Sequence, residues 1–136
     1  MTKPHIQVGV ALILRDGRCL ITQRKPHVHL GGLWEFPGGK CEVGESLEEC
    51  TRREVSEELG LEINQLDYWM THYHEYSEKS VDLVVFDCSI SRGEPMAIDC
   101  SDFRWTKPEH LCEFEFPPAD APIISALLQR MSDRCE

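Results

Sequence analysis

Features of membrane-spanning and secreted proteins are missing from this sequence of 136 residues. No apolar run approaches the ~20 residues that a helix needs to cross a bilayer. The N-terminal segment MTKPHIQVGV has no signal-peptide pattern, and the sequence contains no internal repeat, low-complexity segment or linker. We therefore expect a single domain over residues 1–136, long enough to bury a core and without a membrane partner.

Disulfide and zinc-site patterns are also missing. The seven cysteines are an odd number, and no two of them have the CxxC spacing. Such scattered cysteines argue against both a disulfide framework and a zinc ribbon. Reduced thiols fit the pattern best, so we expect a cytoplasmic protein.

Basic residues are the minority charge, with 14 Lys and Arg against 24 Asp and Glu and a net charge of -10. This balance argues against a protein that grips a long nucleic acid. An acidic protein still binds a phosphorylated small molecule if a metal ion bridges the two anions. Eight of the fourteen basic residues precede Glu54, which places positive groups for phosphates in the first half of the chain.

Alternating and apolar segments predict strands at residues 5–14, 19–24, 33–36, 66–76, 81–89 and 103–106. Turns are predicted at Asp16-Gly17 and at residues 92–95. A short helix is expected from Lys107, followed by a Pro-rich loop at residues 114–120 and a final amphipathic helix capped by Asp120. Together with a long helix after Ser46, these elements predict an α/β fold with two long helices on one sheet.

The stretch from Gly39 to Leu61 contains the clearest helix signals. Ser46 followed by Glu49 has the spacing of a capping box. Leu59-Gly60 supplies the stop, because glycine adopts the left-handed conformation that closes a helix. The helix is therefore predicted to begin just after Ser46 and to end at Leu59.

Three glutamates on this helix are candidate metal ligands. Glu54, Glu57 and Glu58 stand at i, i+3 and i+4, so their carboxylates converge on one face. A bound cation would relieve their mutual repulsion, and oxygen-only ligands suit a hard ion such as Mg²⁺ or Mn²⁺. The alternative is a solvated acidic helix face, which is what most charge runs are.

The stretch resembles the Nudix box, whose pattern is G, five residues, E, seven residues, then REUxEExGU with U aliphatic. Every specified position is matched, by Gly39, Glu45, Arg53, Glu54, Val55, Glu57, Glu58, Gly60 and Leu61. The runs LWEFPGGK and FPPAD and the pair Gln23-Arg24 extend the similarity to the MutT branch of the Nudix hydrolases. The resemblance covers Ile6 to about Leu128.

The resemblance implies the Nudix fold, a mixed sheet between helices. It also implies metal-dependent hydrolysis of nucleoside triphosphates to the monophosphate and pyrophosphate. Members of this branch sanitise the nucleotide pool and so avoid mutation, most famously by removing 8-oxo-dGTP. We therefore expect a nucleoside triphosphate diphosphatase that uses Mg²⁺ or Mn²⁺ and has a role in DNA repair, with 8-oxo-dGTP as its first expected substrate.

The same resemblance implies catalytic and metal-binding residues. Glu54, Glu57 and Glu58, with the carbonyl of Gly38, match the metal ligands. Arg53 matches the residue that orients the glutamates, and Lys40 matches a lysine near the attacking water. Asp99 stands at a further metal-linked position where a glutamate is usual, so it is a candidate ligand or general base, with a soluble loop residue as the alternative.

Residues outside the box are implied to contact the substrate. Arg24 and His29 match phosphate contacts, although Arg24 also fits a surface arginine at a strand end. Glu35 and Phe36 match residues near the sugar and base, and Phe36 also fits the core.

Asp120 stands where the MutT pattern has an asparagine. An ionised aspartate only accepts hydrogen bonds, which suits the N4 amine of cytosine and also the N1-H and N2 amine of a guanine. A second expected activity is therefore CTP or 5-methyl-dCTP pyrophosphohydrolysis. Two further alternatives are a non-catalytic Nudix module that binds a nucleotide and a Nudix hydrolase that acts on a different diphosphate, such as ADP-ribose, a dinucleoside polyphosphate or capped RNA. The oligomeric state is left open between a monomer and a homodimer.

Overall fold

The computed structural model describes residues 3–90 and 93–134. Its strands are β1 (His5–Arg15), β2 (Arg18–Gln23), β3 (Trp34–Glu35), β4 (Gly38–Lys40), β5 (Gln65–Glu75), β6 (Ser80–Ser89) and β7 (Asp102–Thr106). The two α-helices are α1 (Leu47–Leu59) and α2 (Ala121–Arg134), and the 3₁₀ helices are η1 (Pro108–Glu113) and η2 (Pro118–Asp120). No helix in the described ranges is long and apolar enough to cross a membrane. The turn predicted at residues 92–95 begins at Arg92, outside those ranges.

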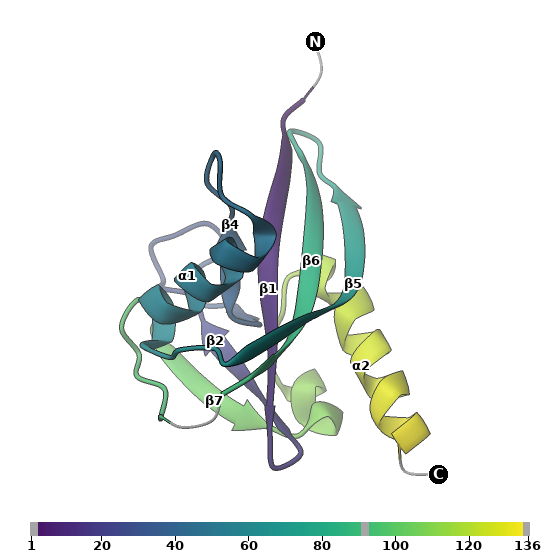
Figure 1. Ribbon diagram of the computed structural model, residues 1–136. Helices are drawn as coiled ribbons and strands as arrows, with labels where there is room; N and C mark the ends of the chain where they lie inside the picture. The colour runs from purple at the N-terminus through teal and green to yellow at the C-terminus, as the bar shows by residue number, and fades with distance from the viewer. Residues whose placement is uncertain (1–2, 91–92, 135–136) are drawn as a thin grey trace.

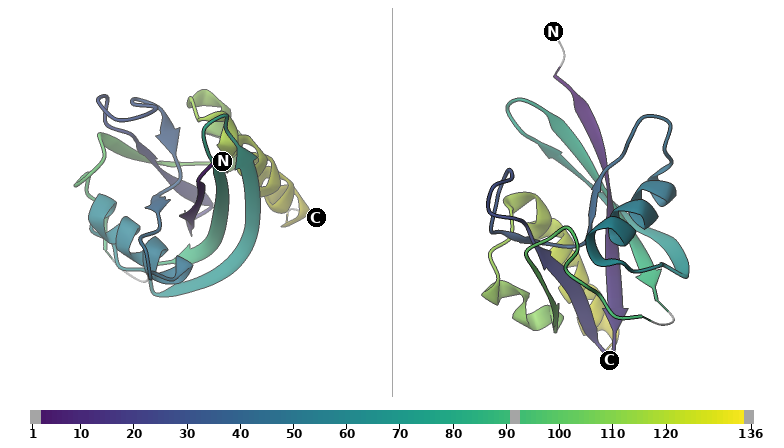
Figure 2. Two further views of the ribbon diagram at one scale, coloured as in Figure 1. Left: turned by 90° about the horizontal axis from the view of Figure 1, so that it is seen from above. Right: turned by 90° about the vertical axis from the view of Figure 1, so that its left-hand side faces the viewer.

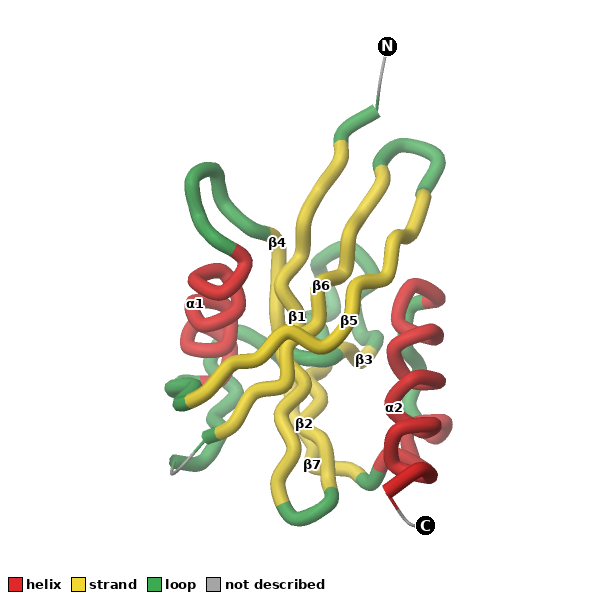
Figure 3. Tube along the Cα trace, turned by 45° about the vertical axis from the view of Figure 1, so that its right-hand side comes forward, coloured by secondary structure: helices red, strands yellow, loops and turns green. Residues whose placement is uncertain are grey.

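The seven-stranded sheet is built around β1, which pairs with neighbours on both of its edges (Figure 1). Along one edge β1 runs parallel to β6, and β6 pairs antiparallel with β5. The other edge of β1 pairs first with β4 and then, near the chain turn, with β2. β2 also pairs with β3 and β7 (Figure 3). The sheet is therefore mixed, as predicted.

Strand alternation divides the core into two layers, because successive side chains point to opposite faces of a sheet. On β1, Val10 and Leu12 pack with α2, whereas Ala11 and Ile13 pack with α1. The same alternation continues on β6. The two α-helices consequently cover opposite faces of the sheet (Figure 2), and the predicted α/β architecture is confirmed.

The C-terminal part of the chain differs from the prediction in two places. The short helix expected from Lys107 is the 3₁₀ helix η1, and it ends where Phe114 becomes extended and packs edge-on against Trp34, with ring centroids 5.0 Å apart. The Pro-rich loop contains η2, which includes Asp120.

The predicted N-cap role of Asp120 is wrong. An N-cap residue has an extended backbone and accepts a hydrogen bond from the helix on its side chain. Asp120 instead lies inside the 3₁₀ turn of η2, with its own N–H bonded to the carbonyl of Pro117 at 3.0 Å. Within the described residues, no donor bonds the Asp120 carboxylate.

Candidate active site

Both ends of helix α1 have the caps that its sequence predicts. The hydroxyl of Ser46 accepts a hydrogen bond from the N–H of Glu49 at 3.1 Å, and the Glu49 carboxylate accepts from the N–H of Ser46 at 3.0 Å. At the other end Gly60 has φ 70° and donates to the carbonyl of Ser56 at 2.9 Å. The capping box and the glycine stop are confirmed, and they fix where α1 begins and ends.

Glycines let this helix and its carboxylates approach the sheet directly. A Cβ at Gly9 on β1 would lie 2.3 Å from Oγ1 of Thr51, and one at Gly39 on β4 would lie 2.4 Å from the carboxyl carbon of Glu54. Gly38 has φ 147°, and its Cβ would lie 2.1 Å from the carbonyl oxygen of Gly9. Any side chain at Gly38 or Gly39 would therefore collide with β1 or with a candidate metal ligand.

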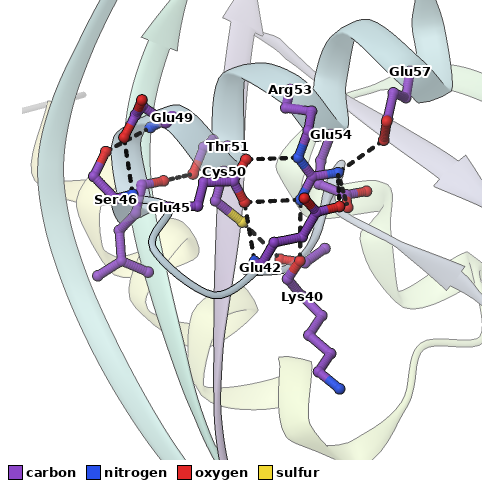
Figure 4. Close-up of polar contacts among 12 residues, drawn as sticks. Lys40, Glu42, Glu45, Ser46, Glu49, Cys50, Thr51, Arg53, Glu54 and Glu57 are labelled. Atoms are coloured by element: carbon purple, nitrogen blue, oxygen red, sulfur yellow. Dashed lines mark hydrogen bonds and ion pairs between the residues drawn. The ribbon is translucent and has the colours of Figure 1, made fainter.

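The guanidinium of Arg53 joins the loop before α1 to the glutamates on it (Figure 4). Nε and Nη2 donate to the two carboxylate oxygens of Glu45 at 2.7 and 2.9 Å. Nη1 donates to Glu54 at 2.9 Å and to Glu57 at 2.8 Å, and Nη2 also donates to the carbonyl of Lys40. The contact between Arg53 and Glu45 is bidentate, which is a strong form of ion pairing. It holds the pKa of Glu45 down to about 2.

Two of the predicted ligands are carboxyl groups removed from water. Glu58 is 8% exposed, and its Oε1 accepts a hydrogen bond from the N–H of Gly38 at 3.0 Å. Burial raises the pKa of Glu58 to about 9 despite that hydrogen bond, with further increases from the charges of Glu35, Glu54 and Asp99. Burial also raises the pKa of Glu54, against the opposing effect of Arg53.

Asp99 is brought beside Glu58 by backbone hydrogen bonds. The N–H groups of Ile98 and Asp99 both donate to the carbonyl of Glu58, at 3.0 and 3.1 Å. The side chain of Asp99 is 64% exposed and pairs with the ammonium of Lys25 at 2.7 Å. The structure therefore places the predicted fourth carboxylate at the C-terminal end of α1, in contact with a lysine.

The predicted substrate residues line one cavity beside β4. Nη1 of Arg24 lies 3.2 Å from both carboxylate oxygens of Glu35, and its Nε donates to the carbonyl of His29 at 2.7 Å. Burial raises the pKa of Glu35, while Arg24 lowers it. Phe36 is 4% exposed and packs against Phe116, with ring centroids 5.5 Å apart, so it belongs to the core as well as to the cavity wall.

Among the predicted substrate residues that have an ionisable side chain, Asp120 is the most deeply buried, at 9% exposure. Burial raises the pKa of its carboxyl group to about 7, with a further increase from Glu35 and a decrease from Arg24. Near neutral pH this group is therefore present in both protonation states. Its protonated form donates as well as accepts a hydrogen bond.

Two cavities adjoin at β4. One, of about 300 Å³, has apolar walls from β1 and β6 and includes Asp120. The other, of about 220 Å³, is lined by carboxylates and basic groups, namely Arg24, Lys25, Glu35, Lys40, Glu54, Glu58 and Asp99 among others. Both are lined by Arg24, Glu35, Gly38, Gly39 and Lys40. Arg53 and Glu57 line neither cavity.

The donor set of the polar cavity fits a hard divalent cation, because it consists of carboxylate and carbonyl oxygens. The half-buried Glu54 and the buried Glu58 are the groups that would hold such an ion. Burial raises the pKa of both carboxyl groups, and a bound cation would favour their ionised forms. Within the described residues, no three His, Cys, Asp or Glu side chains are gathered closely enough to hold a metal ion. The carboxylates are instead bound by groups of the protein. Glu54 accepts from Arg53, Glu58 accepts from the N–H of Gly38, and Asp99 pairs with Lys25.

Lys25, Tyr76 and Lys79 are cavity residues that the sequence analysis did not assign to the site. Lys25 lines the polar cavity, and its position directly after Arg24 in the basic first half of the chain was the available signal. Tyr76 and Lys79 line the apolar cavity, with the ammonium of Lys79 5.5 Å from the ring centroid of Tyr76. No local sequence pattern indicated these two residues, because they reach the cavity only through the pairing of β6 with β1.

Comparisons with known proteins agree with this geometry. A family model described as NUDIX domain matches residues 9–126. The chain is 35% identical to the CTP pyrophosphohydrolase of Escherichia coli K12 over 90% of this chain and 91% of that protein. It is 31% identical to the 8-oxo-dGTP diphosphatase of Haemophilus influenzae, covering 94% and 95% of the two chains.

A crystal structure of a MutT protein from Methanosarcina mazei Go1 superimposes with a TM-score of 0.82 at 29% identity. The superposition covers 97% of this chain and 98% of that one. With a matching fold, a matching family model and full-length relatives, the chain belongs to the Nudix family and is a MutT-like Nudix hydrolase.

Proposed function

We propose that this enzyme hydrolyses nucleoside triphosphates to the monophosphate and pyrophosphate, with 8-oxo-dGTP as its main substrate in nucleotide-pool sanitation. The observation that carries the proposal is the junction of the two cavities at Gly38-Gly39. A nucleotide lying across that junction would put its triphosphate among the carboxylates and basic groups and its base against the apolar walls and Asp120.

Nudix hydrolases generally use divalent metal ions, and we infer Mg²⁺ or Mn²⁺ here. Such an ion would supply charge neutralisation for the triphosphate and the departing pyrophosphate. Glu54, Glu57, Glu58 and the Gly38 carbonyl are the proposed ligands, with Asp99 as a further carboxylate. The lining of the polar cavity by Glu54, Glu58 and Asp99 supports this assignment.

The other residues have positioning roles in the proposal. Arg53 holds Glu54 and Glu57 through its hydrogen bonds, and Lys40 would face the attacking water. Arg24 and His29 would contact phosphates, while Glu35 and Phe36 would contact the sugar and base. Phosphoryl transfer needs mainly positioning and electrostatic stabilisation, so no covalent nucleophile is required.

Cytidine triphosphates are the second candidate substrates, favoured by the 35% identity to a CTP pyrophosphohydrolase. Asp120 is compatible with either base. When ionised it accepts from the cytosine N4 amine or from the N1-H and N2 amine of a guanine. When protonated it donates to a ring nitrogen or carbonyl oxygen as well.

The test is pyrophosphate release with Mg²⁺, comparing kcat/KM for 8-oxo-dGTP, dGTP, CTP, dCTP and 5-methyl-dCTP. A preference for 8-oxo-dGTP of about tenfold or more over every cytosine nucleotide supports the first proposal, since 1.4 kcal/mol of discrimination is tenfold. Equal or higher values for the cytosine nucleotides replace it with the second. Nucleotide binding without pyrophosphate release from any of the five would indicate a non-catalytic module.

The cellular setting is also part of the proposal. We infer a cytoplasmic enzyme that acts as a single Nudix domain over residues 1–136, as a monomer or homodimer, on free nucleotides. The acidic net charge of -10 supports small-molecule substrates over long nucleic acids. The role in DNA repair would then be indirect, through removal of a damaged precursor.

A further inference from the structure

Lys25 forms an ion pair with Asp99, one of the proposed metal ligands. Its ammonium lies 2.7 Å from Oδ1 of Asp99, and both residues line the polar cavity together with Glu54 and Glu58. The sequence resemblance assigned no role to this lysine. In the free protein, the carboxylate of Asp99 is thus neutralised by the chain itself.

Backbone hydrogen bonds hold the Asp99 segment beside the cavity, whereas Lys25 reaches the cavity through a long side chain. The N–H groups of Ile98 and Asp99 are bonded to the carbonyl of Glu58, and the N–H of Met96 is bonded to the carbonyl of Leu59. The segment is therefore tied to the end of α1. The lysine, in contrast, is a flexible four-carbon chain that begins just after strand β2.

The ion pair itself is easily exchanged. The side chains of Lys25 and Asp99 are 37% and 64% exposed, and exposed pairs contribute little because water screens them. A divalent cation at Asp99 would outcompete a single ammonium group. The displaced ammonium of Lys25 would remain in the cavity, where the phosphate oxygens of a bound substrate could accept its hydrogen bonds.

The two arginines of this region are already bound to carboxylates. Arg24 is bound to Glu35 and to the carbonyl of His29, and Arg53 is bound to Glu45, Glu54 and Glu57. Among the described residues, Lys25 and Lys40 are the basic groups lining the polar cavity that no buried or half-buried carboxylate holds.

We propose that Lys25 neutralises Asp99 in the free enzyme and binds the phosphates of the substrate once a divalent cation has taken its place at Asp99. This inference rests on the proposed function for its second half. Its first half concerns the protein and a metal ion without any nucleotide. The two halves are therefore tested separately.

The first experiment measures Mn²⁺ binding without nucleotide, from the electron paramagnetic resonance signal of free Mn²⁺. Lys25→Gln should bind Mn²⁺ more tightly than the wild type by about 3- to 5-fold, the factor that corresponds to an exposed ion pair of up to ~1 kcal/mol. Lys25→Arg keeps the charge and should bind as the wild type does. In an Asp99→Asn background, Lys25→Gln should no longer change the affinity.

Lys3 provides a matched control for the loss of one positive charge. It pairs with Glu75 at 3.3 Å, with side-chain exposures of 33% and 59%, and lines neither cavity. Lys3→Gln should leave Mn²⁺ affinity unchanged. An equal effect of Lys3→Gln and Lys25→Gln, or an effect of Lys25→Gln that persists in Asp99→Asn, would overturn the first half of the proposal.

The second experiment measures hydrolysis at saturating metal. Lys25→Gln should raise KM by about tenfold or more, since a hydrogen bond to a charged group is worth ~1.5–3 kcal/mol, while kcat changes by less than about threefold. Lys25→Arg should restore KM. An unchanged KM in Lys25→Gln overturns the phosphate contact. If the wild type releases no pyrophosphate, the proposed function fails, and calorimetric binding of a nucleoside triphosphate replaces KM.

Discussion

The carboxyl group of Glu54 rests directly on the backbone of Gly39, where a Cβ would stand 2.4 Å from its carboxyl carbon. The two residues belong to α1 and β4, and this contact sets the height of the helix carboxylates above the sheet. The atoms that a Cβ would meet are the far end of a flexible side chain, so the clash has a local solution: Glu54 moves.

Gly39→Ala should therefore reduce activity far more than stability. Displacement of Glu54 by about 1 Å is expected to lower kcat/KM about 100-fold, because misplaced catalytic groups lose most of their effect. Thermal unfolding and kcat/KM are measured on the same preparation. Ser56→Ala, on the exposed face of the same helix, is the control and should change neither quantity. Full activity in Gly39→Ala would show that Glu54 does not need this position.

Glu54→Gln and Glu57→Gln should each lower turnover by about 10³-fold or more without unfolding the protein, as loss of a charged group at a phosphoryl-transfer site does. Glu57 is the sharper test, because it is 54% exposed and lines neither cavity. Turnover is measured with circular dichroism as the folding check. Glu62→Gln, an exposed glutamate beyond α1, is the control, and near-normal turnover in either variant removes that residue from the ligand set.

Asp120 should make stability depend on pH between about 4 and about 7. Its folded-state pKa, about 7, lies above the ordinary value of 3.8. The folded state therefore binds more protons than the unfolded state in this window, and its stability falls as the pH rises through it. Denaturant unfolding of the wild type and Asp120→Asn, compared at several pH values, isolates this contribution.

The expected result is that the stability advantage of Asp120→Asn over the wild type grows as the pH rises from about 4 to about 7. Asp133→Asn, an exposed position on α2, should show no such trend. A difference between Asp120→Asn and the wild type that is the same at every pH would contradict the raised pKa.

Asp120→Asn should also shift base preference. The asparagine amide donates and accepts at every pH, so it gains contacts to a guanine edge and loses the charge that favours an exocyclic amine. The ratio of kcat/KM for 8-oxo-dGTP to that for CTP is expected to rise about tenfold, the size of one gained or lost hydrogen bond in a substrate pocket. An unchanged ratio would mean that Asp120 does not contact the base.

Helix α1 shows how much local sequence can predict. Its start, its stop and the shared face of its glutamates depend on residues within one or two turns of each other. Hydrogen bonds between Ser46 and Glu49, and the left-handed Gly60, need no distant partner. The strands other than β4 were predictable for a similar reason, because alternation reports which side chains are buried. Strand β4, at Gly38–Lys40, was not predicted, because it exists only through its pairing with β1.

The N-cap prediction for Asp120 failed where local and distant effects compete. Its position before a helix favoured a cap, but the prolines at 117 and 118 direct the chain into a 3₁₀ turn and aim the carboxyl group into a cavity. The pKa of Asp120 is then raised by burial and further by Glu35, and lowered by Arg24. Both of those residues are distant from Asp120 in the sequence.

The amino-acid sequence alone was sufficient for the α/β class, the bounds of α1 and the family resemblance, because these follow from short-range spacing and periodicity. The joining of a polar to an apolar cavity, the burial of Asp120 and the contact between Lys25 and Asp99 required the folded chain. Each depends on strand pairing between segments far apart in the sequence, such as β1 with β4 and β6. Solvent exclusion by that packing, more than residue type, sets the charge state of the carboxyl groups at the site.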